Sequence, residues 1–197
     1  MDDFRYRTPA RRLKPSIQVN YSNYKPELRE DFNERCGYCG DHDFFRNTFY
    51  EIDHFVPKKK LIKIKENTYS NLVYSCRSCN NSKREKWPTD SETIHNDGKV
   101  GFIDPCCPDF PKQFRRGKDG SIIPESQIGL WIYKALNFAN PVHRITWTME
   151  RLRVDMIAIL NKINAGNADL TVHSLLRQLL NEYLKFEEEL KGGTPHF

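Results

Sequence analysis

The sequence predicts an α+β protein: a metal-held core of two strands and a helix, followed by a mainly helical C-terminal extension. Two Cys-x-x-Cys pairs, beginning at Cys36 and Cys76, bracket the core. Between the pairs, residues 44–52 and 71–74 are rich in aromatic and β-branched side chains, which is typical of strands. After residue 140, apolar residues recur at alternating steps of three and four, the period of amphipathic helices.

Composition excludes a membrane protein. The 197 residues carry a net charge of +5, and 29% of them are charged. No apolar run approaches the roughly 18 residues of a membrane span, and the first residues lack the apolar stretch of a secretory signal. We therefore expect a cytoplasmic protein with no membrane partner. Most of the basic excess lies in residues 1–100, which favours a polyanionic partner. A basic surface that contacts only solvent would explain the same charge distribution.

The N-terminal quarter predicts an arm and a short helix. Residues 1–25 are basic and are interrupted by Pro9 and Pro15, which favours an extended arm. Such an arm either lies on nucleic-acid phosphates or packs along the protein surface, and the sequence leaves both open. The core is predicted over 26–92. It begins with a helix at 26–35, which has a proline at its first position and acidic residues in its first turns.

The centre of the core predicts strand, loop, strand and helix in that order. The first strand covers 44–52 and is closed by Asp53 and His54, after which a Val-Pro pair turns the chain into a run of lysines. The second strand covers 71–74. A short helix follows over 80–86, where a Trp-Pro pair stops it.

Two further segments complete the domain organisation. Residues 93–125 are rich in turns and are expected to wrap the core. Residues 126–197 form a helical region with helices at 126–138, from 141 to a break at Gly166, and from a cap at Asp169. The last helix has an apolar face wider than one neighbouring helix covers, owing to Leu175, Leu180 and Leu184. It is either buried on two sides, one of them the core, or partly a docking surface for a partner protein.

Four cysteines predict a structural zinc site. Cys36, Cys39, Cys76 and Cys79 can supply four thiolates to one tetrahedral Zn²⁺, and cysteine pairs of this kind in a cytosolic chain indicate zinc before disulfides. Four protein ligands leave no open position for water, so this ion holds the scaffold and does no chemistry. The remaining pair, Cys106 and Cys107, is interpreted as small buried apolar side chains.

Asp53, His54 and Asn80 predict a second metal site, which supports hydrolysis. A carboxylate and an amide oxygen are ligands that a hard divalent cation prefers. Because neighbouring residues of a strand face opposite sides, His54 can stand across a scissile phosphate from the ion and take a proton from water. Glu51 is either a supporting carboxylate or an outward-facing strand residue.

Residues 36–86 resemble the HNH nuclease motif, a ββα-metal finger. The resemblance implies that His54 is the general base and that Asp53 and Asn80 hold a catalytic Mg²⁺ or Mn²⁺ ion. It also identifies Asn71 as the middle asparagine, which in that family supports the loop after the base through hydrogen bonds. The last position is often histidine in the family, so Asn80 leaves the identity of the ion more open.

Basic side chains near the motif are the expected phosphate contacts of a DNA substrate. Such contacts position a substrate without reading its sequence, so we expect little sequence specificity. Lys83 is included because its position in the family commonly faces phosphate. The predicted contacts are Lys58, Lys59, Lys60, Lys63, Lys65, Lys83, Arg84 and Lys86.

A softer resemblance extends beyond the motif. Segments 101–105, 118–124 and 135–138, together with Phe114, are similar to the HNH nucleases of Septu and retron anti-phage systems (PtuB-like proteins). This resemblance implies a partner ATPase of the ABC or SMC type that restrains or licenses the nuclease, with the C-terminal helical face as a candidate docking surface. It also implies cleavage of DNA during phage infection as the output.

Three alternatives remain open at the level of sequence. The core could be a non-catalytic zinc module that binds nucleic acid or a partner. It could be a modification-dependent restriction endonuclease, selective for methylated DNA. It could also be a nuclease whose substrate is RNA.

Overall fold

The computed structural model describes residues 3–45, 50–166 and 169–192. The chain forms two compact units, Met1–Asn140 and Pro141–Phe197, each described by itself. Both helices and small antiparallel sheets are present, which confirms the predicted α+β class. The helical region expected over 126–197 is divided between the units, because its first helix belongs to the first one.

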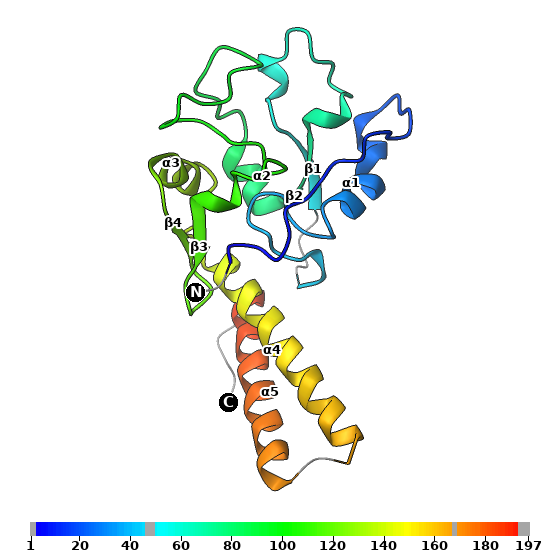
Figure 1. Ribbon diagram of the computed structural model, residues 1–197, viewed down its shortest axis with the longest axis vertical. Helices are drawn as coiled ribbons and strands as arrows, with labels where there is room; N and C mark the ends of the chain where they lie inside the picture. The colour runs from blue at the N-terminus through cyan, green and yellow to red at the C-terminus, as the bar shows by residue number, and fades with distance from the viewer. Residues whose placement is uncertain (1–2, 46–49, 167–168, 193–197) are drawn as a thin grey trace. The chain divides into compact units, whose positions relative to one another are not determined.

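The first unit contains a sheet of two strands followed directly by a helix. Strands β1 (Tyr50–His54) and β2 (Leu72–Cys76) pair antiparallel, with His54 opposite Leu72. Helix α2 (Arg77–Lys83) begins after Cys76, whose sulfur accepts the N–H of Cys79. Figure 1 shows α2 beside the β1–β2 pair, so the predicted strand–loop–strand–helix order is confirmed.

Three predicted boundaries differ. Helix α1 is Lys25–Asp31, because Asn33 and Glu34 have φ values of 55° and 60°, in the left-handed region that ends a helix. Residues Asp43–Phe45 form the 3-10 helix η2 and not the start of a strand; residues 46–49 lie outside the described residues. Helix α2 begins and ends three residues earlier than predicted, because Cys76 caps its start and Arg84, with a φ of 46°, ends it.

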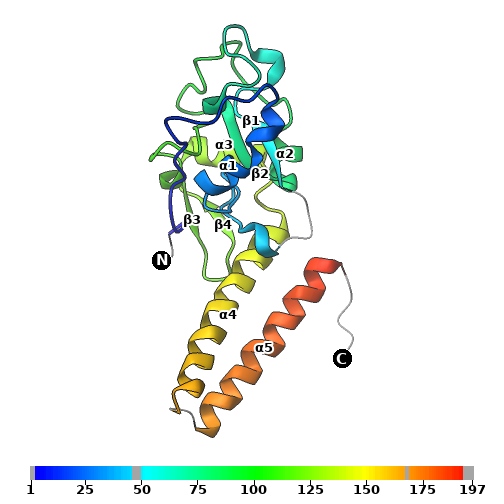
Figure 2. The ribbon, with the colours of Figure 1, turned by 90° about the vertical axis from the view of Figure 1, so that its right-hand side faces the viewer.

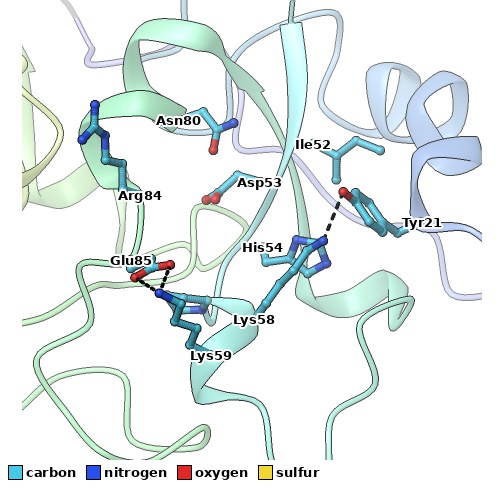
Figure 3. A pocket seen from close by; sticks show the side chains of 10 residues that line it. Tyr21, Ile52, Asp53, His54, Lys58, Lys59, Asn80, Arg84 and Glu85 are labelled. Carbon is cyan, nitrogen blue, oxygen red and sulfur yellow. Dashed lines mark hydrogen bonds and ion pairs between the residues drawn. The ribbon is translucent and has the colours of Figure 1, made fainter.

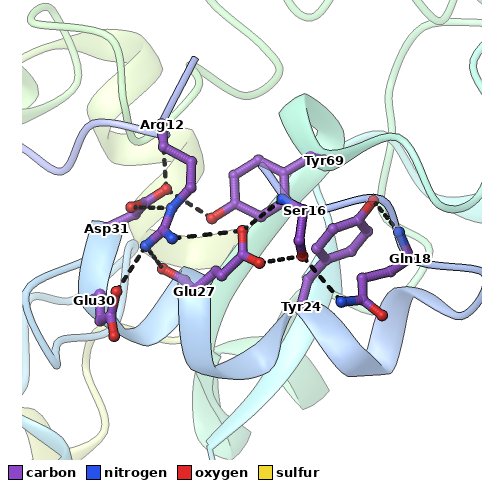
Figure 4. A network of polar contacts seen from close by, with 8 residues as sticks. All are labelled: Arg12, Ser16, Gln18, Tyr24, Glu27, Glu30, Asp31 and Tyr69. Atoms are coloured by element: carbon purple, nitrogen blue, oxygen red, sulfur yellow. Dashed lines mark hydrogen bonds and ion pairs between the residues drawn. The ribbon is translucent and has the colours of Figure 1, made fainter. Parts of the chain in front are cut away.

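The N-terminal arm packs along the protein. Arg12 pairs with Glu27, Glu30 and Asp31 along helix α1 (Figure 4). Arg11 donates to the carbonyl of Leu72 over 2.8 Å and pairs with Asp104. The charges of these arginines are paired within the protein, so the structure supports the alternative in which the arm packs along the protein surface.

Residues 93–140 of the first unit share the core of the strands. Phe102, Phe110, Ile132 and Leu136 are fully buried in the same apolar cluster as Leu72. The elements of this region are η5 (Pro111–Gln113), the antiparallel pair β3 (Phe114–Arg116) and β4 (Ile122–Pro124), and α3 (Gln127–Ala135).

Arg116 joins this second sheet to the cysteine pair at the start of the core. It is buried, and its guanidinium donates to the carbonyl of Cys39 over 2.7 Å and to that of Gly120 over 2.8 Å. Because a buried charge is costly unless it is paired and hydrogen-bonded, these bonds fix the position of β3 relative to the Cys36–Cys39 turn. The cysteine pair is therefore supported from outside the strand–helix motif.

Three short 3-10 helices complete the loops around the sheet. Helix η1 precedes α1, and η3 and η4 lie between β1 and β2. Their bounds are Tyr21–Tyr24, Lys58–Lys60 and Tyr69–Asn71.

The second unit is a hairpin of two long helices. Helices α4 (Pro141–Asn164) and α5 (Leu170–Lys191) lie side by side in Figures 1 and 2. Asp169 caps α5 by accepting the N–H of Val172, as predicted. Within this unit α5 packs against α4, and none of its described residues is buried. Among the described residues, no helix is long and apolar enough to cross a membrane.

Candidate active site and metal centre

The four predicted cysteines come together at the ends of the strands. Cys36, Cys39, Cys76 and Cys79 are all buried, and their sulfur atoms lie within 4.8 Å of one another. The sulfurs of Cys39 and Cys76 are 3.8 Å apart. A tetrahedral zinc ion with Zn–S bonds of about 2.3 Å requires sulfur atoms about 3.8 Å apart, so the thiols fit such an ion. Cys106 and Cys107 lie apart from this cluster and are half-buried.

A tight backbone approach holds the first cysteine pair against β2. The N–H of Gly37 donates to the carbonyl of Tyr74 over 2.8 Å. A Cβ atom at Gly37 would lie 2.6 Å from the ring of Phe32 and 2.8 Å from Val73, so only glycine fits there. The sequence thus brings the Cys36–Cys39 turn onto the strand that carries Cys76.

A hollow of about 230 Å³ lies beside the end of β1 (Figure 3). It brings together Asp53, His54 and Asn80, the three residues predicted to do chemistry. His54 is the last residue of β1, and Asp53 and His54 line the same hollow. The other lining residues are Tyr21, Ile52, Pro57, Lys58, Lys59, Arg84 and Glu85.

Asp53 and Asn80 present oxygen atoms to this hollow. The Oδ2 atom of Asp53 accepts hydrogen bonds from the Tyr38 hydroxyl at 2.5 Å and from the Lys83 ammonium at 2.9 Å. The amide nitrogen of Asn80 donates to Glu51 over 2.7 Å, and Figure 3 shows its amide oxygen on the side facing Asp53. A carboxylate and an amide oxygen placed in this way form a donor set that suits a hard divalent cation.

Burial sets the protonation of the groups around Asp53. It raises the pKa of Asp53, and the Lys83 charge and the Tyr38 hydrogen bond oppose that rise. Burial and the Asp53 charge raise the pKa of Tyr38 well above its usual value, so the phenol keeps the proton that it donates.

His54 is oriented as a base. Its Nε2 atom lies 2.8 Å from the carbonyl oxygen of Glu66. A carbonyl only accepts, so Nε2 carries the hydrogen and, in the neutral ring, Nδ1 has the free lone pair. Burial has the largest effect and lowers the pKa of His54, while the hydrogen bond with the Glu66 carbonyl opposes this shift. The neutral form of the ring therefore predominates near neutral pH.

Asn71 lies behind the site. Its side-chain oxygen accepts the N–H of Val56 over 2.8 Å, and its amide nitrogen donates to the carbonyl of Val56 over 3.1 Å. The carbonyl of Asn71 accepts the N–H of Phe55 over 2.8 Å. These bonds hold the loop that follows His54, and Asn71 does not line the hollow.

The predicted phosphate contact at Lys83 is wrong. Its side chain is completely buried, and its ammonium is bonded to Asp53 and to the carbonyl of His54. The prediction rested on a family position that commonly faces phosphate, but here α2 turns this residue into the core. No phosphate can reach the ammonium there.

The other predicted basic contacts separate into two groups. Lys58, Lys59 and Arg84 are exposed and line the hollow. Lys58 pairs with Glu66 and donates to the Tyr21 hydroxyl over 3.2 Å, and Lys59 pairs with Glu85. The remaining four do not line the hollow: Lys60 pairs with Asp90, Lys63 and Lys65 are exposed, and Lys86 donates to the carbonyl of Ala135.

Sequence reasoning missed Tyr21 and Tyr38. The ring of Tyr21 lies edge-on to His54, 4.7 Å between centroids, and forms a wall of the hollow from the N-terminal arm. Tyr38 lies between the first two cysteines, and the sequence there indicates a turn but no role for the tyrosine. Glu51, for which the sequence allows two roles, accepts the hydrogen bond from the Asn80 amide.

Comparison with known families gives one match, which covers the core. Residues 36–86 match the family model described as HNH endonuclease. No curated protein and no solved structure matches the chain. The matched segment carries the four cysteines, Asp53, His54, Asn71 and Asn80, so it supports nuclease activity at the level of the family.

Proposed function

We propose that this protein is a metal-dependent endonuclease that hydrolyses phosphodiester bonds of DNA. One observation carries the proposal: Asp53, Asn80 and a histidine oriented as a base line one hollow beside exposed basic side chains. A non-catalytic zinc module has no need for this combination. The match to the HNH endonuclease model supports the same reaction class.

The residues would divide the work as follows. Asp53 and Asn80 would hold a divalent cation, Mg²⁺ or Mn²⁺, which when bound neutralises developing phosphate charge and assists the leaving oxygen. His54 takes a proton from the attacking water at Nδ1, while the Glu66 carbonyl keeps Nε2 protonated and the ring in place. Lys58, Lys59 and Arg84 hold flanking phosphates.

The four thiolates would hold a Zn²⁺ ion with a purely structural role. With all four positions taken by sulfur, no coordination position is left for water. That ion would tie the Cys36–Cys39 turn to the start of α2, which carries Asn80. It would thereby set the distance between Asp53 and Asn80.

Plasmid cleavage tests the proposal. We expect the purified protein to convert supercoiled plasmid to nicked or linear forms with Mg²⁺ or Mn²⁺, and EDTA to stop the reaction. His54→Ala should abolish cleavage and retain zinc content and far-UV circular dichroism. Wild-type cleavage by that variant would refute the role of His54, and an inactive wild-type protein that still binds DNA would favour the non-catalytic module.

Two comparisons of substrates decide between the remaining alternatives. Equal cleavage of methylated and unmethylated plasmid argues against a modification-dependent restriction endonuclease. Preference for DNA over an RNA of the same sequence argues against a ribonuclease. We expect both results.

We further propose an anti-phage role with an ATPase partner of the ABC or SMC type. The similarity of segments 101–105, 118–124 and 135–138 to PtuB-like nucleases supports it. Co-expression with an ATPase encoded beside the nuclease gene tests it: we expect the two proteins to purify together and to protect cells from phage only when His54 is intact. Protection by the His54→Ala variant would refute the nuclease as the effector.

A further inference from the structure

Lys83 is the only completely buried lysine among the described residues, and it contacts both Asp53 and His54. Its ammonium is 2.9 Å from Oδ2 of Asp53 and donates to the carbonyl oxygen of His54 over 2.8 Å. It also lies 5.6 Å from the centre of the Phe102 ring, on the side of the core. A buried ammonium is tolerated only when it is paired and hydrogen-bonded, and both partners belong to the candidate site.

The bonds from Lys83 and Tyr38 fall on the same carboxylate oxygen. Both groups bond Oδ2 of Asp53. A carboxylate held through one oxygen by two donors cannot rotate freely, so its second oxygen keeps one direction. Asp53 and Asn80 line the same hollow, and we assign this second oxygen to the cation.

The same ammonium fixes the backbone of the base. The carbonyl of His54 is bonded to Lys83, and its imidazole is bonded to the carbonyl of Glu66. The peptide and the ring of His54 are thus each held by one hydrogen bond. Lys83 is the one side chain that contacts both Asp53 and His54 by hydrogen bonds or ion pairs among those described.

We infer that Lys83 is a positioning residue of the nuclease, which fixes the carboxylate of Asp53 and the backbone of His54 relative to each other before substrate binds. This inference rests on the proposed function. Lys83 touches neither phosphate nor the reacting atoms, since it is completely buried. The next residue, Arg84, is exposed and lines the hollow, and we assign the phosphate contact on this part of the chain to Arg84.

Lys83→Met and Arg84→Gln form a matched pair for the test. Methionine has nearly the length of lysine without its charge. Cleavage kinetics with Mn²⁺ give kcat and KM, and DNA binding with Ca²⁺ in place of Mn²⁺ gives an affinity at several salt concentrations. We expect Lys83→Met to lower kcat by about 10- to 100-fold, the range for residues that orient metal ligands, with unchanged DNA affinity and salt slope. Arg84→Gln should raise KM more than it lowers kcat, and should reduce the salt slope by about one.

A stability measurement covers the case in which Lys83→Met folds poorly. We measure the thermal midpoint and zinc content of Lys83→Met, Asp53→Asn and the double variant. Removing only the ammonium leaves Asp53 unpaired and should lower the midpoint most, and the neutral double variant should recover much of that loss. Without recovery, the pairing of Lys83 with Asp53 does not explain the effect, and the inference fails.

The outcomes separate the inference from the proposed function. If the wild-type protein cuts and Lys83→Met cuts with the same kcat, only the inference is overturned. A lower salt slope with unchanged kcat in Lys83→Met would also overturn it, because that result marks a phosphate contact. If the wild-type protein cuts nothing with any divalent ion, the proposed function fails, and the stability cycle still reports whether Lys83 neutralises Asp53.

Discussion

The side-chain nitrogen of Asn80 donates a hydrogen bond of 2.7 Å to Glu51, a residue of the neighbouring strand β1. Glu51 therefore determines which end of the Asn80 amide faces Asp53. The relationship parallels the one between Lys83 and Asp53. In each of the two proposed ligands, one polar atom is bonded to a side chain that does not line the hollow. Fixed ligands of this kind are expected to bind a cation without first reorganising.

Replacing Glu51 should disturb the amide of Asn80. Glu51→Ala removes the acceptor, so the amide can rotate, and we expect kcat to fall by about 10- to 100-fold. Glu51→Gln keeps an acceptor oxygen and should retain most of the activity. Cleavage rates at saturating Mn²⁺, with zinc content as the control, check this prediction; equal rates for the two variants would contradict it.

Tyr21 should matter for activity although it lies outside the matched segment. Its ring packs against His54, and its hydroxyl accepts from Lys58. Tyr21→Ala opens that wall of the hollow and should lower kcat/KM by about tenfold, or about 1.4 kcal/mol of transition-state stabilisation. Tyr21→Phe keeps the ring and should lose much less. A wild-type rate for Tyr21→Ala would show that the arm does not take part in the site.

Loss of one thiolate should unfold the core. Cys79→Ser leaves three sulfur ligands, and metal binding at such a site is coupled to folding. We expect this variant to lose zinc and to aggregate or to lose its cooperative thermal transition. Cys107→Ser, outside the cluster, is the control and should keep both properties. A folded, zinc-free Cys79→Ser protein would remove the structural role of zinc.

The loop at residues 62–64, within the lysine-rich segment after β1, depends on the charge of Glu92. Its carboxylate accepts the N–H groups of Ile62, Lys63 and Ile64, and these bonds hold the pKa of Glu92 below its usual value of 4.5. A carboxyl whose pKa is lowered by folding stabilises the fold above its usual pKa, and that contribution is lost as the pH falls through the lowered value. Glu92→Gln should therefore have a lower thermal midpoint than the wild type at neutral pH.

Thermal unfolding followed by circular dichroism at several pH values checks this dependence. The difference between the Glu92→Gln and wild-type midpoints should shrink as the pH falls below about 4.5, because the wild-type carboxyl then loses its charge. A difference independent of pH would show that the charge of Glu92 does not hold the loop.

The sequence predicts the strand–helix core well because the relevant information is local. The spacing of Cys36 and Cys39 and that of Cys76 and Cys79 each restrict one turn, and Asp53 and His54 are adjacent in the chain. The backbone hydrogen bond from Gly37 to the Tyr74 carbonyl of β2 then brings both cysteine pairs together. Helix lengths in the second unit follow from apolar periodicity, with Asp169 as a cap.

The errors arise where tertiary packing decides. Lys83 looks like a surface residue because lysine is seldom buried, and only the position of Asp53 beside α2 makes burial of its charge possible. The sequence leaves the position of the basic arm open, because only the folded chain places Arg12 against Glu27, Glu30 and Asp31 along helix α1 (Figure 4). Tyr21 reaches His54 from a distant part of the chain, and no local pattern indicates that contact.

The bond from Arg116 to the carbonyl of Cys39 bears on how this protein can be dissected. Residues 36–86 would be the natural fragment to excise, but cutting there removes the guanidinium that supports the cysteine turn and the Phe102 ring beside Lys83. The exposed apolar surface left behind would favour aggregation of the fragment. For grafting, shuffling or directed evolution, the transferable module is therefore larger than residues 36–86 and includes at least Phe102 and Arg116.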